Sequence, residues 1–192
     1  MRILAAFAFA ALPGGAFAAP AFLPTQDVAV TYELNVPNRT PENYLLRYSA
    51  AGQMARVDPQ AGGYFLLGNL PAGQAELIIP GMHAVVQAPD FSALTAQIYN
   101  ADGAQFTPLG PGHYAGLDCE KYLVLDKNGT GTACLTPSGV VLHFAGHDAR
   151  GSAEVTALSV TYAPQPADVF ATPPGLTPLD LPPEAVQALL NQ

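Results

Sequence analysis

The chain has 192 residues, with 15 acidic and 7 basic side chains, a formal net charge of −8 and 49% apolar residues. Only 11% of the residues are charged, which excludes a charge-dense coiled coil, and the apolar content excludes a disordered chain. Lysines and arginines spread this thinly cannot form the basic patch that a nucleic-acid-binding protein needs. We therefore expect one compact domain and no nucleic-acid partner.

Residues 1–18 have the three parts of a secretory signal peptide. Arg2 supplies the positive start, residues 3–12 are apolar, and Ala16 and Ala18 form an A-x-A cleavage site. A ten-residue helix is about 15 Å long, half of a ~30 Å hydrocarbon core, so cleavage is favoured over anchoring. Beyond residue 18 no apolar run reaches the ~18 residues of a membrane span. The mature protein is therefore expected to be periplasmic or secreted and not membrane-spanning.

Residues 19–166 contain short segments in which apolar residues alternate with polar ones, bounded by proline and glycine. This pattern predicts antiparallel strands. The clearest is 28–36, apolar at every second position. The predicted strands are 28–36, 44–48, 53–58, 63–68, 74–79, 83–87, a strand near Tyr114, 119–125, 132–135, 140–145 and 154–162.

One helix is predicted within the sheet, at 90–98, where Asp90 is a good N-cap and Phe91 and Leu94 share a face with Ile98. So short a helix must pack on the sheet to be stable. Residues 167–192 form a Pro-rich tail, extended except for a short helix at 184–190. The fold class is therefore mainly β, a single curved antiparallel sheet or half-open barrel of about ten strands with one or two short helices. Its edges must be covered or protected by proline.

Cys119 and Cys134 are the two cysteines of the chain, and in an exported protein such a pair is expected to be oxidised. A two-residue turn at 128–129 would place Cys119 opposite Ser138, about 13 Å from Cys134. That exceeds the ~7 Å that a disulfide permits. We predict the disulfide, with either a loop tip nearer 126–127 or a Cys119 that precedes its strand.

No residue pattern predicts a catalytic site, a metal ion or a cofactor. The chain lacks a G-x-S-x-G elbow and a C-x-x-C pair, and its carboxylates are isolated. Asp126 starts a segment that resembles an EF-hand loop, but Pro137 occupies its twelfth position, so a hairpin tip is expected. On one strand His143 and His147 would lie ~13 Å apart, too far to share a metal ion. We expect the protein not to be an enzyme.

Tyrosine and aliphatic side chains are concentrated at alternate strand positions. A curved sheet with one short helix has more apolar face than the helix can cover, which favours an apolar or lipid-like ligand on the concave face. The alternative is a filled core, and then the protein is an envelope interaction module whose sheet edge or tail binds a protein partner. The candidate ligand-binding residues are Tyr32, Leu34, Tyr44, Leu46, Tyr48, Phe65, Leu77, Ile79, Phe91, Leu94, Tyr122 and Phe144.

Two stretches resemble a pattern of uncharacterised exported bacterial proteins. They are GLDCEKYLV at 116–124 and ACLTPSGVVL at 133–142, an AGxxC strand followed by a second cysteine and a T-x-D/S-G-V turn. MARVD at 54–58 and PGM at 80–82 resemble earlier segments of that group. Such proteins are similar in outline to the periplasmic lipoprotein-carrier (LolA/LolB-like) fold. The resemblance implies an open, curved half-barrel capped by helices and holding acyl chains, with no catalytic residues.

Overall fold

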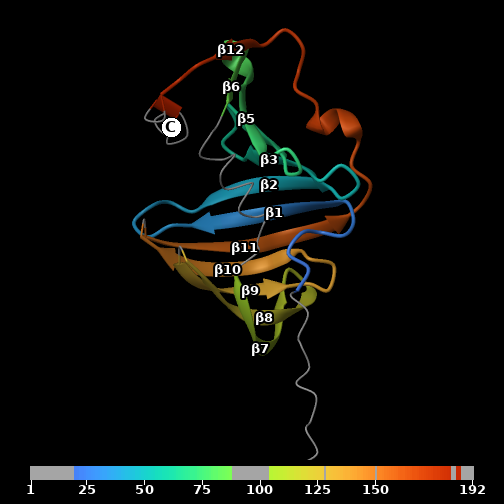
Figure 1. Cartoon of the computed structure of the whole chain (residues 1–192), viewed down its shortest axis with the longest axis vertical. Coiled ribbons are helices and arrows are strands. Elements are labelled where there is room, and N and C mark those ends of the chain that lie inside the picture. The colour runs from blue at the N-terminus through green and yellow to red at the C-terminus, as the bar shows by residue number, and fades with distance from the viewer. Residues whose placement is uncertain (1–19, 88–103, 128, 150, 183–184, 187–192) are drawn as a thin grey trace, which may run out of the picture.

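The protein forms one open sheet of 12 strands in the order β12-β6-β5-β4-β3-β2-β1-β11-β10-β9-β8-β7 (Figure 1). The structure is a computed structural model that describes residues 20–87, 104–127, 129–149, 151–182 and 185–186. The strands are β1 (Val28–Asn35), β2 (Glu42–Ser49), β3 (Met54–Pro59), β4 (Phe65–Asn69), β5 (Gln74–Ile79), β6 (Ala84–Gln87), β7 (Gln105–Tyr114), β8 (Leu117–Asp126), β9 (Gly129–Leu135), β10 (Val141–Asp148), β11 (Gly151–Tyr162) and β12 (Thr177–Leu179). Two 3-10 turns, η1 (Pro80–Met82) and η2 (Ala167–Phe170), complete the described elements.

The mainly β class and the single open sheet are confirmed, and each predicted strand has a counterpart within a few residues. β7 is longer than the predicted strand near Tyr114, and β12 was not predicted. The predicted helix at 90–98, the signal peptide at 1–18 and most of the helix at 184–190 lie outside the described residues. The domain limits at 18 and 166 stay predictions, although β12 joins part of the tail to the sheet.

The sheet has two faces, which the strand register separates. Tyr32 on β1 lies opposite Tyr44 on β2 and Ala157 on β11, and we call their side the Tyr32 face. Arg56 on β3 lies opposite Arg47 on β2, on the other side, which we call the Arg56 face. Successive side chains of a strand alternate between faces, so the register assigns the remaining residues. The central strands bury the Tyr32 face most deeply, and Val28 and Val30 are 0% exposed.

At its β7 end the sheet curls back on itself. The ring of Tyr114, at the end of β7, stacks on His143 of β10 with 4.7 Å between the ring centroids. The Cys119–Cys134 disulfide lies in the same region, with a Cα–Cα distance of 5.4 Å. β7 and β10 are separated in the sheet by β8 and β9, so this contact requires strong curvature. The curved, open sheet therefore agrees with the sequence prediction.

The β8–β9 hairpin resolves the conflict between the turn and the disulfide. Asp126 pairs with Gly129, so the tip lies one position before the simple turn at 128–129. Cys134 then lies opposite Lys121, only two residues from Cys119. The predicted disulfide is confirmed, and the first of the two predicted alternatives, a tip nearer 126–127, is the one adopted.

Both edges of the sheet contain proline. Edge strand β7 contains Pro108 and Pro111, and β12, at the other edge, contains Pro178. Proline has no N–H to donate to an added strand, and it is tolerated in sheets mainly at edges. The edge protection expected from the sequence is thus present at both ends.

The C-terminal segment (residues 163–186) wraps around the β6 edge, and in Figure 1 it runs from β11 along one side of the sheet to β12. Leu176 packs on the Arg56 face against a cluster of Phe65, Leu67 and Ile78. β12 then pairs in parallel with β6. Beyond it, Leu179, Leu181 and Val186 pack against Leu77, Ile79 and Val86 on the Tyr32 face. The segment therefore covers both faces at this end of the sheet.

Candidate functional site

Most candidate ligand-binding residues share the Tyr32 face. The strand register joins them through paired positions such as Tyr32–Tyr44, Leu66–Leu77 and Tyr122–Ala133. The nine that share this face are Tyr32, Leu34, Tyr44, Leu46, Tyr48, Leu77, Ile79, Tyr122 and Phe144. Phe91 and Leu94 lie outside the described residues.

Phe65 lies on the opposite face. It pairs with Ile78, and the guanidinium of Arg56 lies 3.8 Å above the centre of its ring. The period-2 pattern explains the separation, because Phe65 is adjacent in sequence to Leu66, which lies on the Tyr32 face. The sequence alone does not show whether Phe65 or Leu66 shares a face with the other candidates, because both are apolar.

The Tyr32 face is filled around Leu77 and around Val28, Val30 and Tyr48, and it is half-buried elsewhere. Leu77 is 0% and Ile79 8% exposed, because the C-terminal segment packs on them. On β1 and β2, by contrast, Leu34, Tyr44 and Leu46 are only half-buried, as are Tyr122 and Phe144 on β8 and β10. Any ligand on this face would therefore contact the half-buried part rather than Leu77 and Ile79.

The tyrosine hydroxyls on this face are held by polar contacts. Tyr32 Oη donates a hydrogen bond of 2.7 Å to the carbonyl oxygen of Val141, reaching across β11 to β10. Burial, and secondarily the charge of Tyr162, raise the pKa of Tyr32 well above its ordinary value. The Tyr32 hydroxyl therefore remains neutral at physiological pH, and its hydrogen bond holds the Tyr32 ring in place.

A second tyrosine group lies near the start of β2. Tyr44 Oη donates a hydrogen bond to Glu42 Oε2, and Tyr44 and Tyr64 also share a hydrogen bond. Burial first, and then Glu42, raise the pKa of both Tyr44 and Tyr64. These neutral hydroxyls place polar groups beside an apolar face, the arrangement expected at the mouth of an amphipathic ligand site.

Phe144 lies flat along strands β9 and β10. A Cβ atom at Gly146 would be 2.6 Å from its ring, and one at Gly131 would be 3.1 Å from it. The two glycines thus leave room for the ring on the Tyr32 face. Phe144 contributes an aromatic surface there that side chains at these positions would displace.

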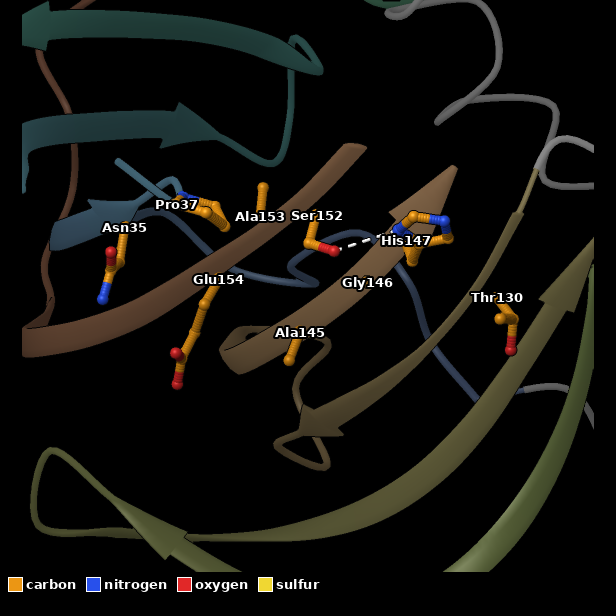
Figure 2. Close-up of a pocket in the computed structure, with 9 residues that line it drawn as sticks. All are labelled: Asn35, Pro37, Thr130, Ala145, Gly146, His147, Ser152, Ala153 and Glu154. Atoms are coloured by element: carbon orange, nitrogen blue, oxygen red, sulfur yellow. Dashed lines mark hydrogen bonds between the residues drawn. The ribbon is translucent and has the colours of Figure 1, made fainter. Parts of the chain in front are cut away.

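A pocket of about 430 Å³ with both polar and apolar lining residues lies on the Arg56 face, where β1 ends beside β9, β10 and β11 (Figure 2). Its lining residues are Asn35, Pro37, Thr130, Ala145, Gly146, His147, Ser152, Ala153 and Glu154. His147 Nδ1 lies 2.9 Å from Ser152 Oγ, and His143 Nε2 lies 2.8 Å from Glu154 Oε1. The sequence does not reveal this pocket, because its polar residues occupy the ordinary solvent-facing positions of the strands.

The pocket geometry does not match a serine-protease triad. In a triad the serine binds histidine Nε2 and a carboxylate binds Nδ1, whereas here Nδ1 faces Ser152. Within the described ranges, no group of three or more His, Cys, Asp or Glu side chains could hold a metal ion. No helix in the part of the chain that the structure describes is long and apolar enough to cross a membrane.

Solved structures with the same type of sheet provide the comparisons. No protein-family model matches the sequence, and no curated protein is similar to it in sequence. An uncharacterised conserved protein from Thermus thermophilus has a TM-score of 0.55 at 12% identity, over 82% of this chain and 91% of that one. A chain in the Pseudomonas aeruginosa MucA/MucB complex has a TM-score of 0.54 at 12% identity, over 79% of this chain and 57% of that one.

A LolA superfamily protein, NE2245 from Nitrosomonas europaea, is less similar, with a TM-score of 0.41 at 10% identity over 79% of this chain and 93% of its own. The likeness to the Thermus protein and to the MucA/MucB chain shows a common fold. This chain spans little more than half of that MucA/MucB chain. The open antiparallel sheet implied by the sequence resemblance is therefore confirmed, while export and lipid carriage stay predictions.

Proposed function

We propose that this protein is a non-enzymatic periplasmic protein that binds a lipid-like ligand, such as an acyl chain, on the half-buried part of the Tyr32 face. One observation carries the proposal: Leu34, Tyr44, Leu46, Tyr122 and Phe144 share a face and are half-buried, while the same face is filled around Leu77. Half-buried aliphatic and aromatic side chains lose further contact with water when an apolar ligand covers them.

The apolar contact alone is large enough for binding. Transfer of a methylene group from water to apolar surroundings contributes about 0.8 kcal/mol. An acyl chain that buries several methylenes therefore gains several kcal/mol before the entropy of immobilisation is subtracted. The neutral hydroxyls of Tyr44 and Tyr64 would contact the polar end of the ligand.

Residence in the periplasm agrees with the Cys119–Cys134 disulfide, since disulfides persist in oxidising compartments. The predicted signal peptide at 1–18 is the sequence support for export. Sequencing the N-terminus of protein recovered from the periplasm tests the cleavage site. A mature chain that begins near Ala19 is expected, and an intact Met1 in that fraction would contradict export by cleavage.

Fluorescence titration with cis-parinaric acid tests the ligand proposal. Saturable enhancement is expected for the mature protein, and Leu46→Gln should weaken it because the amide replaces an apolar contact on the Tyr32 face. The matched control is Leu45→Gln, because Leu45 is the adjacent half-buried leucine but lies on the Arg56 face. Equal weakening by both variants, with folding verified by circular dichroism, would refute the site.

A second candidate function is a protein-interaction module. The observation that favours it is the common fold with a chain of the MucA/MucB complex. Deletion of the C-terminal segment cannot test it cleanly, because that segment packs on both faces of the sheet. Instead, a photo-crosslinking residue at exposed Leu109 or Leu125 should trap one defined envelope polypeptide, and absence of any crosslinked species in the periplasm would count against this candidate.

A further inference from the structure

The pocket on the Arg56 face is separate from the proposed lipid site. Asn35 lies opposite Glu154, Ala145 opposite Thr132, and Thr130 opposite His147, all on the side of the sheet away from Tyr32. The pocket's volume of about 430 Å³ is within the ~300–1,000 Å³ of small-molecule sites. A ligand here would therefore bind independently of one on the Tyr32 face.

Two of the pocket's polar groups are held in position by neighbouring side chains. His147 is fixed by its hydrogen bond with Ser152, as Figure 2 shows. Glu154 is held by His143, whose side chain is 15% exposed and stacks on the ring of Tyr114. Polar groups that are already ordered lose less entropy when they bind a ligand. His143 and Tyr114 are thus positioning residues behind the pocket.

The donors and acceptors of the pocket select a class of ligand. The Asn35 amide, the Thr130 and Ser152 hydroxyls and the His147 ring can each both donate and accept hydrogen bonds. Glu154 is the one charged residue among the lining residues, and it already faces His143. A bound anion would contact no lysine or arginine in this lining. A bound cation would contact only the Glu154 carboxylate, which already pairs with His143. The lining therefore favours an uncharged ligand.

Sugar hydroxyl groups also donate and accept, and they match this set. Pro37 and Ala145 add apolar surface to the same lining, against which the C–H groups of a sugar ring can pack. We propose that this pocket binds a small uncharged sugar of one or two rings, with Asn35, Thr130, His147, Ser152 and Glu154 as its hydrogen-bonding partners.

Saturation-transfer NMR on the mature chain, with glucose, N-acetylglucosamine, cellobiose and chitobiose, tests the proposal. At least one of these sugars should receive saturation, with ethanolamine and inorganic phosphate as charged controls that do not. Thr130→Ala should raise the dissociation constant about two- to tenfold, the effect of one lost hydrogen bond. Thr132→Ala is the matched control, because this threonine is exposed on the same strand and face but does not line the pocket.

A double variant and the possible NMR results decide whether the pocket binds a sugar. The double variant Asn35→Ala/Thr130→Ala should abolish binding of the sugar, and both positions are exposed, so the fold should survive. Three results would overturn the proposal: no saturation transfer to any of the four sugars, an equal rise in the dissociation constant for Thr130→Ala and Thr132→Ala, or binding of ethanolamine in place of a sugar. Binding of cis-parinaric acid should be unchanged in the Thr130 variant, which separates failure here from failure of the lipid site.

Discussion

Substitution of Arg56 by alanine should loosen the attachment of η2 to the Arg56 face. The guanidinium of Arg56 contacts both carboxylate oxygens of Asp58, donates a hydrogen bond of 3.2 Å to the carbonyl oxygen of Val169 in η2, and stacks on Phe65. Arg56 thus links β3 to η2. Arg47 also pairs with Asp58, at 2.6 Å, and provides a matched arginine for comparison.

The expected cost follows from these contacts. A hydrogen bond from a charged group contributes about 1.5–3 kcal/mol, and stacking of a cation on an aromatic ring about 0.5–2 kcal/mol. The ion pair adds about 0–1 kcal/mol, and contacts made by one side chain do not add fully. We expect Arg56→Ala to lower the free energy of unfolding by about 2–4 kcal/mol. Arg47→Ala should lower it by about 1 kcal/mol or less, since only its ion pair is lost.

Urea denaturation and limited proteolysis measure the two effects together. Arg56→Ala should shift the urea midpoint and expose the residues around η2 to cleavage, because Val169 loses its hydrogen bond to Arg56. Arg47→Ala should leave the cleavage pattern unchanged. Equal destabilisation by the two variants, or a C-terminal segment that stays resistant in Arg56→Ala, would refute the assignment of this contact.

Three further predictions concern the sheet itself. Replacing Cys119 and Cys134 by alanine should lower the free energy of unfolding by about 3 kcal/mol in urea, from the entropy of a loop with sequence separation 15. Gly146→Ala should cost about 1–3 kcal/mol, because its Cβ would lie 2.6 Å from an aromatic ring, while Gly81→Ala, with nothing within 4 Å, should change thermal stability by less than about 0.5 kcal/mol. Tyr32→Phe should cost about 1 kcal/mol at neutral pH. Because its folded pKa is raised above 10.0, Tyr32 contributes to stability below pH 10 and this contribution is lost as the pH rises further, so the difference between Tyr32→Phe and the parent should shrink in alkaline urea titrations.

The strands with strict alternation were predictable from sequence because the pleat itself has a period of two. Val28, Val30 and Tyr32 read correctly as one face for this reason. The strand predicted near Tyr114 is shorter than β7, because Pro108, Gly110 and Pro111 are typical turn residues. Only their position at a sheet edge makes them compatible with a strand.

Three features depend on contacts between residues far apart in the sequence, and the sequence does not predict them: β12, the face on which Phe65 lies, and the pocket beside Asn35. β12 is three residues in a Pro-rich tail, and only its parallel pairing with β6 identifies it as a strand. Phe65 could not be separated from Leu66 without the register to β5, because both are apolar. The pocket beside Asn35 forms where the end of β1 meets β9, β10 and β11, which lie about 100 residues later in the chain, so no local pattern predicts it.

Native mass spectrometry of protein purified from the periplasm tests the central claim, that the Tyr32 face binds an apolar ligand. We predict a species heavier than the disulfide-bonded mature chain by the mass of a lipid, which is lost on organic extraction and restored by adding a fatty acid. The Leu46→Gln variant should retain less of this species than Leu45→Gln. A single mass equal to the bare mature chain, before and after addition of the fatty acid, would contradict the claim.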